Sequence, residues 1–202
     1  MNKWVVFAAI ISLSGISTQA WTAGDAATGK EKSATCAGCH GADGNSANPE
    51  WPKLAGQHPA YMEKQLKEFK SGARKNPTMS PMAASLSDQD IEDLSAFYAG
   101  QNTSAAAADE TLVDVGQKIY RGGNPTTGVA ACIGCHGPTG MGNPAANFPA
   151  ISAQHAKYIS NQLMEFKAGS RDNDAGKMMQ TIAAKMSDAE IKAVASYIQG
   201  LH

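Results

Sequence analysis

The amino-acid sequence predicts an all-α protein that is built from two similar helical domains in tandem. Two observations lead to this prediction. The first is an internal repeat, because many residues of the first half of the 202-residue chain recur about 100 positions later. The second is a helical spacing of apolar residues in both halves, with no stretch that alternates apolar and polar residues as a half-buried strand does. Since each copy holds a complete set of elements, the repeat indicates two domains rather than one fold assembled from halves.

The repeat also gives the domain boundaries. Residues 51–58 correspond to residues 148–155, and later pairs show that the second copy has gained about four residues. The stretch between the copies is rich in alanine and small polar residues and has no periodic apolar face, which is typical of a linker. We therefore expect a first domain over residues 21–103, a linker over residues 104–110 and a second domain over residues 111–202.

Each copy is expected to contain a short helix followed by a longer one. A short helix is expected around residues 26–35 in the first copy and 112–121 in the second. A longer helix is expected over residues 59–71 and 156–168, where apolar residues fall at i, i+4 and i+7 and so share one helix face.

Residues with known capping preferences mark the helix ends. Gly72 and Gly169 directly follow the longer helices and are expected to end them. A last helix in each copy opens at Ser87 or Ser187 as N-cap, and an acidic residue three positions on forms a capping box, which is looser in the first copy because that residue is aspartate. Residues 121–129 are rich in Gly, Pro and Thr and are expected to form a loop.

All four cysteines lie in two copies of the motif Cys-x-x-Cys-His, at residues 36–40 and 132–136. This pentapeptide is the attachment signature of c-type haem, in which each cysteine adds its sulfur across a haem vinyl group. The sequence thus predicts two covalently attached haem c groups, and therefore a redox protein. The predicted attachment residues are Cys36, Cys39, Cys132 and Cys135.

Other uses of the cysteine pairs explain less of the sequence. Two Cys-x-x-Cys pairs can form a zinc site of four thiolates, but here each pair carries its own histidine. A thioredoxin-type pair requires a βαβ context, which the sequence lacks. Disulfides would use the cysteines and leave the repeated histidines unexplained.

The iron of an electron-carrying haem needs two axial ligands. His40 and His136 are the expected proximal ligands, and a methionine on the other side raises the reduction potential. Each copy offers two neighbouring methionines, and the repeat pairs Met79 with Met179. We therefore predict these two as ligands. The second methionine of each copy, Met82 or Met178, is the alternative.

Further repeated residues surround the motifs. The carbonyls of Pro52 and Pro149 are expected to accept the Nδ1 proton of the motif histidines. Bis-histidine ligation through His58 and His155 is an alternative to methionine, but both precede a predicted helix and are interpreted as partly exposed residues at its start. The repeated arginines, Arg74 and Arg171, are interpreted either as partners of a haem propionate or as solvated charges after a helix.

The first twenty residues resemble a secretory signal peptide. Lys3 provides a positive charge, residues 4–13 are apolar but too short to span a bilayer, and small residues end at Ala20. A retained membrane anchor is the alternative. The formal net charge of the chain is −1, and no basic tract suggests nucleic acid or a membrane surface as partner. We expect an exported, periplasmic protein with at most peripheral membrane association.

Both halves contain Cys-His-Gly-x-x-Gly and Tyr-x-x-x-Gln-Leu, and the first adds Pro-x-Leu-Ala-Gly-Gln-His. With these motifs the chain resembles the dihaem cytochrome c4 family, two class I cytochrome c units in tandem. The resemblance implies two His/Met haems, each wrapped by one domain, a periplasmic location and electron transfer towards a terminal oxidase. It also implies that the two domains face each other about a pseudo-twofold axis.

The expected function is therefore electron transfer between redox protein partners, a donor and a terminal oxidase, and not catalysis. The main alternative is a haem enzyme, such as a dihaem peroxidase, or a cytochrome subunit that serves a dehydrogenase. A peroxidase needs an open coordination position on one haem, whereas this chain supplies a methionine in both halves. A redox or gas sensor would carry a signalling domain, which the sequence lacks.

Overall fold

The computed structural model describes residues 24–201, so the predicted signal peptide over residues 1–20 lies outside the described part of the chain. The described part is helical, with two isolated antiparallel bridges and no strands. The helices of the first half are α1 (Ala26–Lys32), α2 (Ala34–His40), α3 (Pro59–Ser71), α4 (Met79–Ala84) and α5 (Asp88–Ala99). Those of the second half are α6 (Val113–Gly122), α7 (Ile133–His136), η1 (Pro144–Ala146), α8 (Ala156–Ala168), η2 (Ala175–Lys177), α9 (Met178–Ala183) and α10 (Asp188–Gln199).

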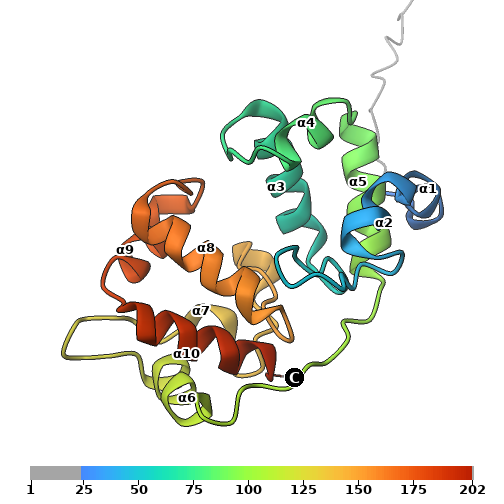
Figure 1. Ribbon diagram of the computed structural model, residues 1–202. Coiled ribbons are helices and arrows are strands. Elements are labelled where there is room, and N and C mark those ends of the chain that lie inside the picture. Colours follow the sequence, from blue (N-terminus) through green and yellow to red (C-terminus); the bar gives the residue numbers. More distant parts are fainter. Residues whose placement is uncertain (1–23, 202) are drawn as a thin grey trace, which may run out of the picture.

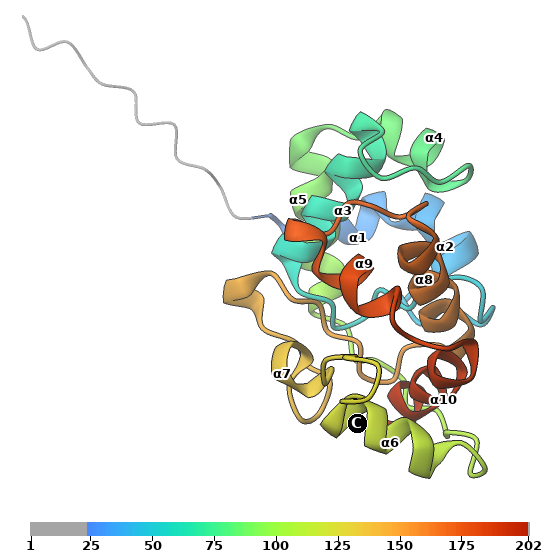
Figure 2. The ribbon, with the colours of Figure 1, turned by 90° about the vertical axis from the view of Figure 1, so that its left-hand side faces the viewer.

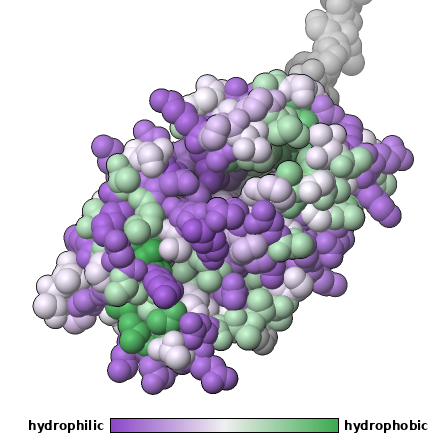
Figure 3. Space-filling model, in the orientation of Figure 1, coloured by the Kyte–Doolittle hydropathy of each residue, from purple (hydrophilic) through white to green (hydrophobic). Residues whose placement is uncertain are grey.

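The two halves form two lobes with the same helix order, which confirms the predicted pair of tandem helical domains (Figures 1 and 2). Helices α3 and α8 face each other where the lobes meet, and the segment between α5 and α6 runs along one side of the molecule (Figure 1). The face shown in Figure 3 is mostly hydrophilic and is hollowed in the first domain. No helix in residues 24–201 is long and apolar enough to cross a membrane.

The predicted long helices and their caps are confirmed. α3 and α8 have the predicted bounds, and each ends at a glycine in the left-handed conformation, with φ of 79° at Gly72 and 72° at Gly169. Ser87 and Ser187 cap α5 and α10, and a complete capping box is present in both. The box in the first domain is therefore as fully formed as that in the second, although its acidic residue is the shorter aspartate.

In each domain the first and last helices cross at a glycine. A Cβ atom at Gly29 of α1 would lie 2.0 Å from the Asp93 carbonyl oxygen of α5, and one at Gly116 of α6 would lie 2.3 Å from the Ala193 carbonyl oxygen of α10. Only glycine allows so close an approach of two helix backbones. The crossing places the last helix against the start of each domain, beside the haem motif.

The structure differs from the predictions in three places. The short helix predicted at residues 26–35 ends at Lys32, and the chain continues from Ser33 directly into α2. Helices α4 and α9 were not predicted, because six residues are too few to show an apolar period. The predicted loop at residues 121–129 begins after the end of α6, and it closes through mutual backbone hydrogen bonds between Asn124 and Val129 of 2.9 and 3.0 Å.

Candidate haem sites

Each Cys-x-x-Cys-His motif lies on a short helix that follows the first helix of its domain. Cys36 and Cys39 lie on α2, and Cys135 lies on α7, which begins directly after Cys132. None of the four forms a disulfide. Cys36 and Cys132 border the apolar cores of their domains, and burial raises the pKa of the Cys132 thiol to about 11. Cysteines at the edge of an apolar core fit attachment to a large apolar macrocycle.

The motif histidines, His40 and His136, are buried and held in matching positions. His40 donates from Nδ1 to the Pro52 carbonyl at 2.8 Å, and His136 donates from Nδ1 to the Pro149 carbonyl at 3.0 Å. The two predicted prolines are therefore confirmed as the acceptors. Burial lowers the pKa of both imidazoles and outweighs the opposing effect of the carbonyls, so the rings are neutral. A neutral ring with Nδ1 bonded in this way presents the Nε2 lone pair to a metal ion.

The chain turns sharply after each motif histidine. Gly41 and Gly44 have φ values of 81° and 79°, and Gly137 and Gly140 have values of 76° and 75°. These values lie in a region that side chains disfavour and glycine adopts freely. At Gly44 there is also no space, because a Cβ atom would lie 2.8 Å from the ring of Tyr98. The repeated glycines thus bring the chain back towards the carbonyl that holds each histidine.

The methionines divide into inward-facing and outward-facing residues. Met79 and Met179 lie at the start of α4 and α9 and are partly buried, whereas Met82 and Met178 are 41% and 42% exposed. This difference favours Met79 and Met179 as the residues that reach an iron inside each domain. The other methionines of residues 24–201 pack in the core, as Met62 and Met186 do, or lie on the surface, as Met141 and Met164 do.

Each domain thus combines two thiols, one buried neutral imidazole and one partly buried thioether, and this set fits a c-type haem. A shared zinc site is not supported, because no group of three or more His, Cys, Asp and Glu side chains in residues 24–201 is placed to hold a metal ion.

Comparison with known proteins agrees with this site. The family model "Cytochrome c" matches twice, over residues 26–100 and 113–202. Cytochrome c4 of Pseudomonas aeruginosa is 47% identical over the full length of both chains. The crystal structure of reduced recombinant cytochrome c4 from Pseudomonas stutzeri superimposes with a TM-score of 0.87 at 46% identity, covering 89% of this chain and all of that one. The thiosulfate dehydrogenase electron acceptor of Stutzerimonas stutzeri is 40% identical over 80% of this chain and 76% of that protein.

The chain belongs to the cytochrome c4 family. As a member of this family it carries two covalent haem c groups, one in each domain, and it is an electron carrier rather than an enzyme. Bound haem supplies one-electron chemistry at iron, while the protein sets the potential through ligands, burial and hydrogen bonds.

In this cytochrome c4 family member the repeated histidines after the haem motifs join the two domains. His58 donates from Nε2 to the Met141 carbonyl at 2.7 Å, and His155 donates from Nε2 to the Ser46 carbonyl at 2.8 Å. Both are N-cap residues, of α3 and α8, which confirms their interpretation as residues at the start of a helix. Since each Nε2 bonds to a carbonyl of the other domain, the structure gives no support to bis-histidine ligation.

Two repeated glutamines form a second pair of crossed contacts. Gln57 exchanges two hydrogen bonds with the backbone of Ala150, of 2.9 and 3.1 Å, and Gln154 exchanges two with the backbone of Lys53, both of 2.9 Å. Lys53 and Ala150 are equivalent in the repeat and directly follow the prolines that hold the haem histidines. The interface is thus nearly twofold symmetric and begins one residue from each histidine acceptor.

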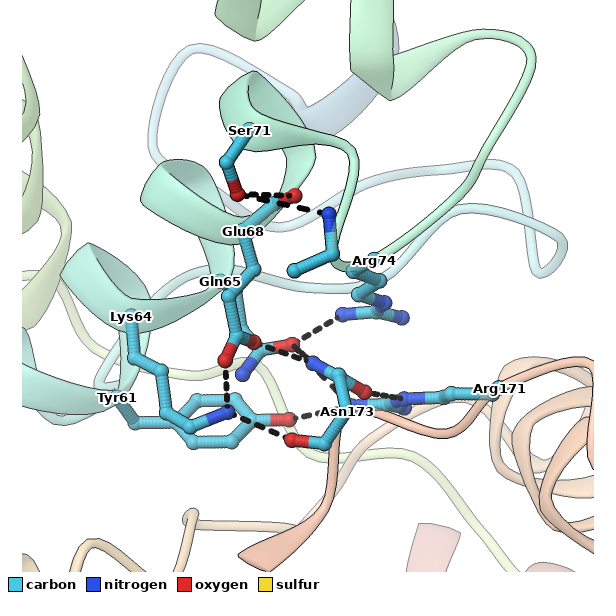
Figure 4. Close-up of polar contacts among 9 residues, drawn as sticks. Tyr61, Lys64, Gln65, Glu68, Ser71, Arg74, Arg171 and Asn173 are labelled. Atoms are coloured by element: carbon cyan, nitrogen blue, oxygen red, sulfur yellow. Dashed lines mark hydrogen bonds and ion pairs between the residues drawn. The ribbon is translucent and has the colours of Figure 1, made fainter.

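The repeated arginines, which follow α3 and α8, form a third crossed contact, and Figure 4 shows both of them beside Tyr61 and Gln65. Arg74 donates to Gln65 of its own domain and to Gln162 of the other, both at 2.7 Å. Arg171 donates to Gln162 at 2.7 Å, to Gln65 at 3.3 Å and to Tyr61 at 3.0 Å. We call these five residues the interdomain arginine cluster.

Both arginines of the interdomain arginine cluster are buried, with exposed fractions of 8% and 7%, so the interpretation as solvated charges is wrong. Within residues 24–201 neither Arg74 nor Arg171 forms an ion pair with a carboxylate. Burial raises the pKa of the Tyr61 phenol, but Arg171 and Arg74 outweigh it, and the pKa lies below its ordinary value. Two buried cations whose hydrogen-bond partners in the cluster are neutral thus lie between the domains, and the charge of Glu165 also acts on Arg171.

The sequence did not identify these residues as parts of an interface between the domains. The signal was present, because Gln57, His58 and Arg74 all recur at equivalent positions in the second half. A repeat shows which residues are equivalent, but it does not show that equivalent residues meet across an interface.

Proposed function

We propose that this cytochrome c4 family member is a periplasmic electron carrier that delivers electrons from a redox donor to a terminal oxidase. The first domain, residues 21–103, would hold one haem and the second, residues 111–202, the other, with residues 104–110 as linker. The proposed attachment residues are Cys36, Cys39, Cys132 and Cys135, and the proposed iron ligands are His40, Met79, His136 and Met179.

The observation that carries this assignment is the duplication of one ligand geometry. In both domains a buried imidazole donates from Nδ1 to a proline carbonyl, at 2.8 Å from His40 and 3.0 Å from His136. That bond fixes the ring plane and strengthens the imidazole as a ligand. The partly buried thioethers of Met79 and Met179 then favour ferrous iron, which suits a carrier of relatively high potential.

The close contact of the two domains supports transfer of electrons between the two haems within one molecule. Histidine, glutamine and arginine side chains each cross the interface in matching pairs. Such contacts hold the two redox centres at a fixed separation, so an electron accepted by one domain has a direct route to the other.

A second candidate is a dedicated electron acceptor for a dehydrogenase. This candidate is supported by the 40% identity to a protein named thiosulfate dehydrogenase electron acceptor, which matches 80% of this chain. The two candidates differ in the specific partner: a terminal oxidase that oxidises the carrier, or a dehydrogenase that reduces it.

An experiment separates them. The dithionite-reduced, desalted holoprotein is mixed with membranes that contain a haem–copper oxidase, and its oxidation and oxygen uptake are followed. Oxygen uptake that rises with the carrier concentration and stops on cyanide addition supports delivery to an oxidase. No oxidation by such membranes, together with rapid reduction of the oxidised protein by a thiosulfate-oxidising dehydrogenase, supports the second candidate instead. Export is tested separately, by fractionation of cells that express the full chain.

A further inference from the structure

Each domain buries one tyrosine beside the first cysteine of its haem motif, but the two tyrosines come from different helices. Tyr98 lies on α5, the last helix of the first domain, and is 1% exposed; Tyr120 lies on α6, the first helix of the second domain, and is 0% exposed. Burial raises the pKa of both phenols, and the neighbouring thiol, Cys36 for Tyr98 and Cys132 for Tyr120, raises it further. Both domains therefore place a phenol beside the first cysteine of the motif, but the tyrosine that supplies it stands at a different position of the repeat.

The repeat makes this exchange explicit. Gly29 and Gly116 occupy the same helix crossing, so four residues further on Ser33 is equivalent to Tyr120. At the last helix, Tyr98 is equivalent to Ile198. The first domain therefore has serine at the first position and tyrosine at the second. The second domain has tyrosine at the first position and isoleucine at the second.

The two phenolic hydroxyls differ in their partners. Tyr120 donates to the carbonyl of Gly137, the residue after the ligand histidine, at 2.7 Å. The Tyr98 hydroxyl is fully buried and has no hydrogen-bond partner among the described residues. A buried donor without an acceptor is rare and costly in a folded protein, which indicates an acceptor that is completed only in the mature, haem-bearing protein.

Cys36 is the acceptor that the surroundings of Tyr98 favour. Cys36 packs against the apolar cluster that contains Tyr98. The pKa of the phenol is raised mainly by burial and, to a smaller extent, by the Cys36 thiol. The other polar neighbour, Ser33, donates its hydroxyl proton to the Lys30 carbonyl at 2.7 Å, and its oxygen keeps lone pairs, so Ser33 is the rival acceptor that the test must separate from Cys36. A thiol competes as a donor, whereas the thioether formed on haem attachment has no proton and can only accept.

We propose that Tyr98 is a positioning residue that donates a hydrogen bond to the thioether sulfur of Cys36 and raises the reduction potential of the first haem. A donor on this sulfur withdraws electron density from the macrocycle edge and so favours ferrous iron. The second haem receives no such bond, because the hydroxyl of Tyr120 is already bound to the Gly137 carbonyl. The two haems thus share one ligand pattern but differ in this contribution to their potentials. The inference rests on haem attachment at Cys36, which the proposed function assigns.

The test is potentiometric titration of purified Tyr98→Phe holoprotein, since phenylalanine keeps the ring and removes only the hydroxyl. We expect one of the two reduction steps to move to lower potential, by roughly three- to tenfold in its reduction equilibrium, where tenfold equals about 59 mV for one electron. Tyr120→Phe is the matched control for loss of a buried phenol hydroxyl, and it should leave that step in place. Ser33→Ala should also leave it in place; a shift equal to that of Tyr98→Phe would assign the bond to Ser33 and overturn the proposal.

A spectroscopic measurement distinguishes a hydrogen bond from altered packing. The resonance Raman modes of the thioether C–S bonds should differ between H₂O and D₂O for the parent protein, and this difference should be lost in Tyr98→Phe. Identical spectra in both solvents for the parent protein, or superimposable titrations of parent and variant, would refute the proposal. Failure of haem attachment at Cys36 is recognised separately, because the haem content would then be one rather than two per chain.

Discussion

Arg74 of the first domain lies 2.7 Å from Gln162 of the second, measured from Nη2 to Oε1, and Gln162 also accepts a bond of 2.7 Å from Arg171. One glutamine oxygen therefore holds two buried guanidinium groups, one from each domain. Because like charges at close range repel in a medium of low dielectric constant, this arrangement depends on neutral acceptors and on anionic groups nearby. Among the described residues, the Glu165 carboxylate is such a group, because its charge acts on Arg171.

Loss of this shared acceptor should weaken the domain contact. In Gln162→Leu, Arg74 and Arg171 each lose a bond of 2.7 Å and remain buried, which we expect to cost about 2–5 kcal/mol of stability. Calorimetry of the holoprotein should then show two separated unfolding transitions in place of one. Gln117→Ala, at an exposed position of α6, is the control and should leave a single transition. A single, unshifted transition in Gln162→Leu would show that the cluster does not join the domains.

The helix crossings predict a sharp contrast between glycines. In Gly29→Ala the new Cβ atom would lie 2.0 Å from the Asp93 carbonyl oxygen, so α1 and α5 must separate. We expect a loss of about 2–4 kcal/mol, measured by denaturant unfolding of the holoprotein. Gly122→Ala, on α6, is the control, since nothing lies within 4 Å of a Cβ atom there and alanine is the better helix former. Equal stability of the two variants would contradict the crossing.

The sequence predicted contacts between residues close together in the chain well, and contacts between residues far apart in the chain poorly. The bounds of the helix at residues 59–71 and the capping boxes depend on neighbouring residues, and they were predicted correctly. The Pro52 carbonyl was identified as partner of His40, because the fold of a haem motif brings a nearby segment back to the ring. The bonds from Gln154 to Lys53 and from Arg74 to Gln162 were not predicted, because they depend on how two complete domains dock. The unpaired hydroxyl of Tyr98 likewise depends on packing between helices far apart in the sequence.

Acid should destabilise the first domain through Asp93. Bonds from Lys32, the Asp25 backbone N–H and Gln89 hold the pKa of Asp93 below its ordinary value near 3.8. A carboxylate with a lowered folded-state pKa stabilises the fold above its unfolded-state pKa, and this stability is lost as the pH falls through the folded-state value. The melting temperature should therefore fall as the pH drops below about 4. The second domain has Ala193 at this position, and its own acid sensitivity depends instead on Glu190, whose pKa is lowered by the hydrogen bond from Asn124 and by Ser187.

The control for this acid sensitivity is Asp93→Asn, which keeps the size of the side chain and removes its titration. This variant should be less stable than the parent protein at pH 7, and the difference should shrink as the pH falls below about 4 and through the lowered folded-state pKa, where the parent carboxylate is protonated. Parallel curves for the two proteins from pH 7 to acid would rule out Asp93 as the source.

The methionine assignment makes a direct spectroscopic prediction. Met79→Ala should abolish the methionine–iron charge-transfer absorption of one oxidised haem, and Met82→Ala, at a position that is 41% exposed, should not. In the second domain Met179→Ala should act like Met79→Ala, and Met178→Ala should have no effect. Loss of the band in Met82→Ala or Met178→Ala alone would reverse the assignment in that domain.

Ligand binding separates a carrier from a catalyst. If Met79 and Met179 both bind iron, neither haem has a vacant position for carbon monoxide or peroxide. A ligand must then displace a thioether at the start of α4 or α9, two helices that pack on α3 and α8 and that each contain a fully buried alanine, Ala83 or Ala183. The reduced protein at neutral pH should therefore keep its absorption spectrum under carbon monoxide, while Met79→Ala, with one position opened, should bind about one equivalent. Rapid stoichiometric binding by the intact protein would show that one methionine is not an iron ligand. One haem would then have an open coordination position, as a haem enzyme requires.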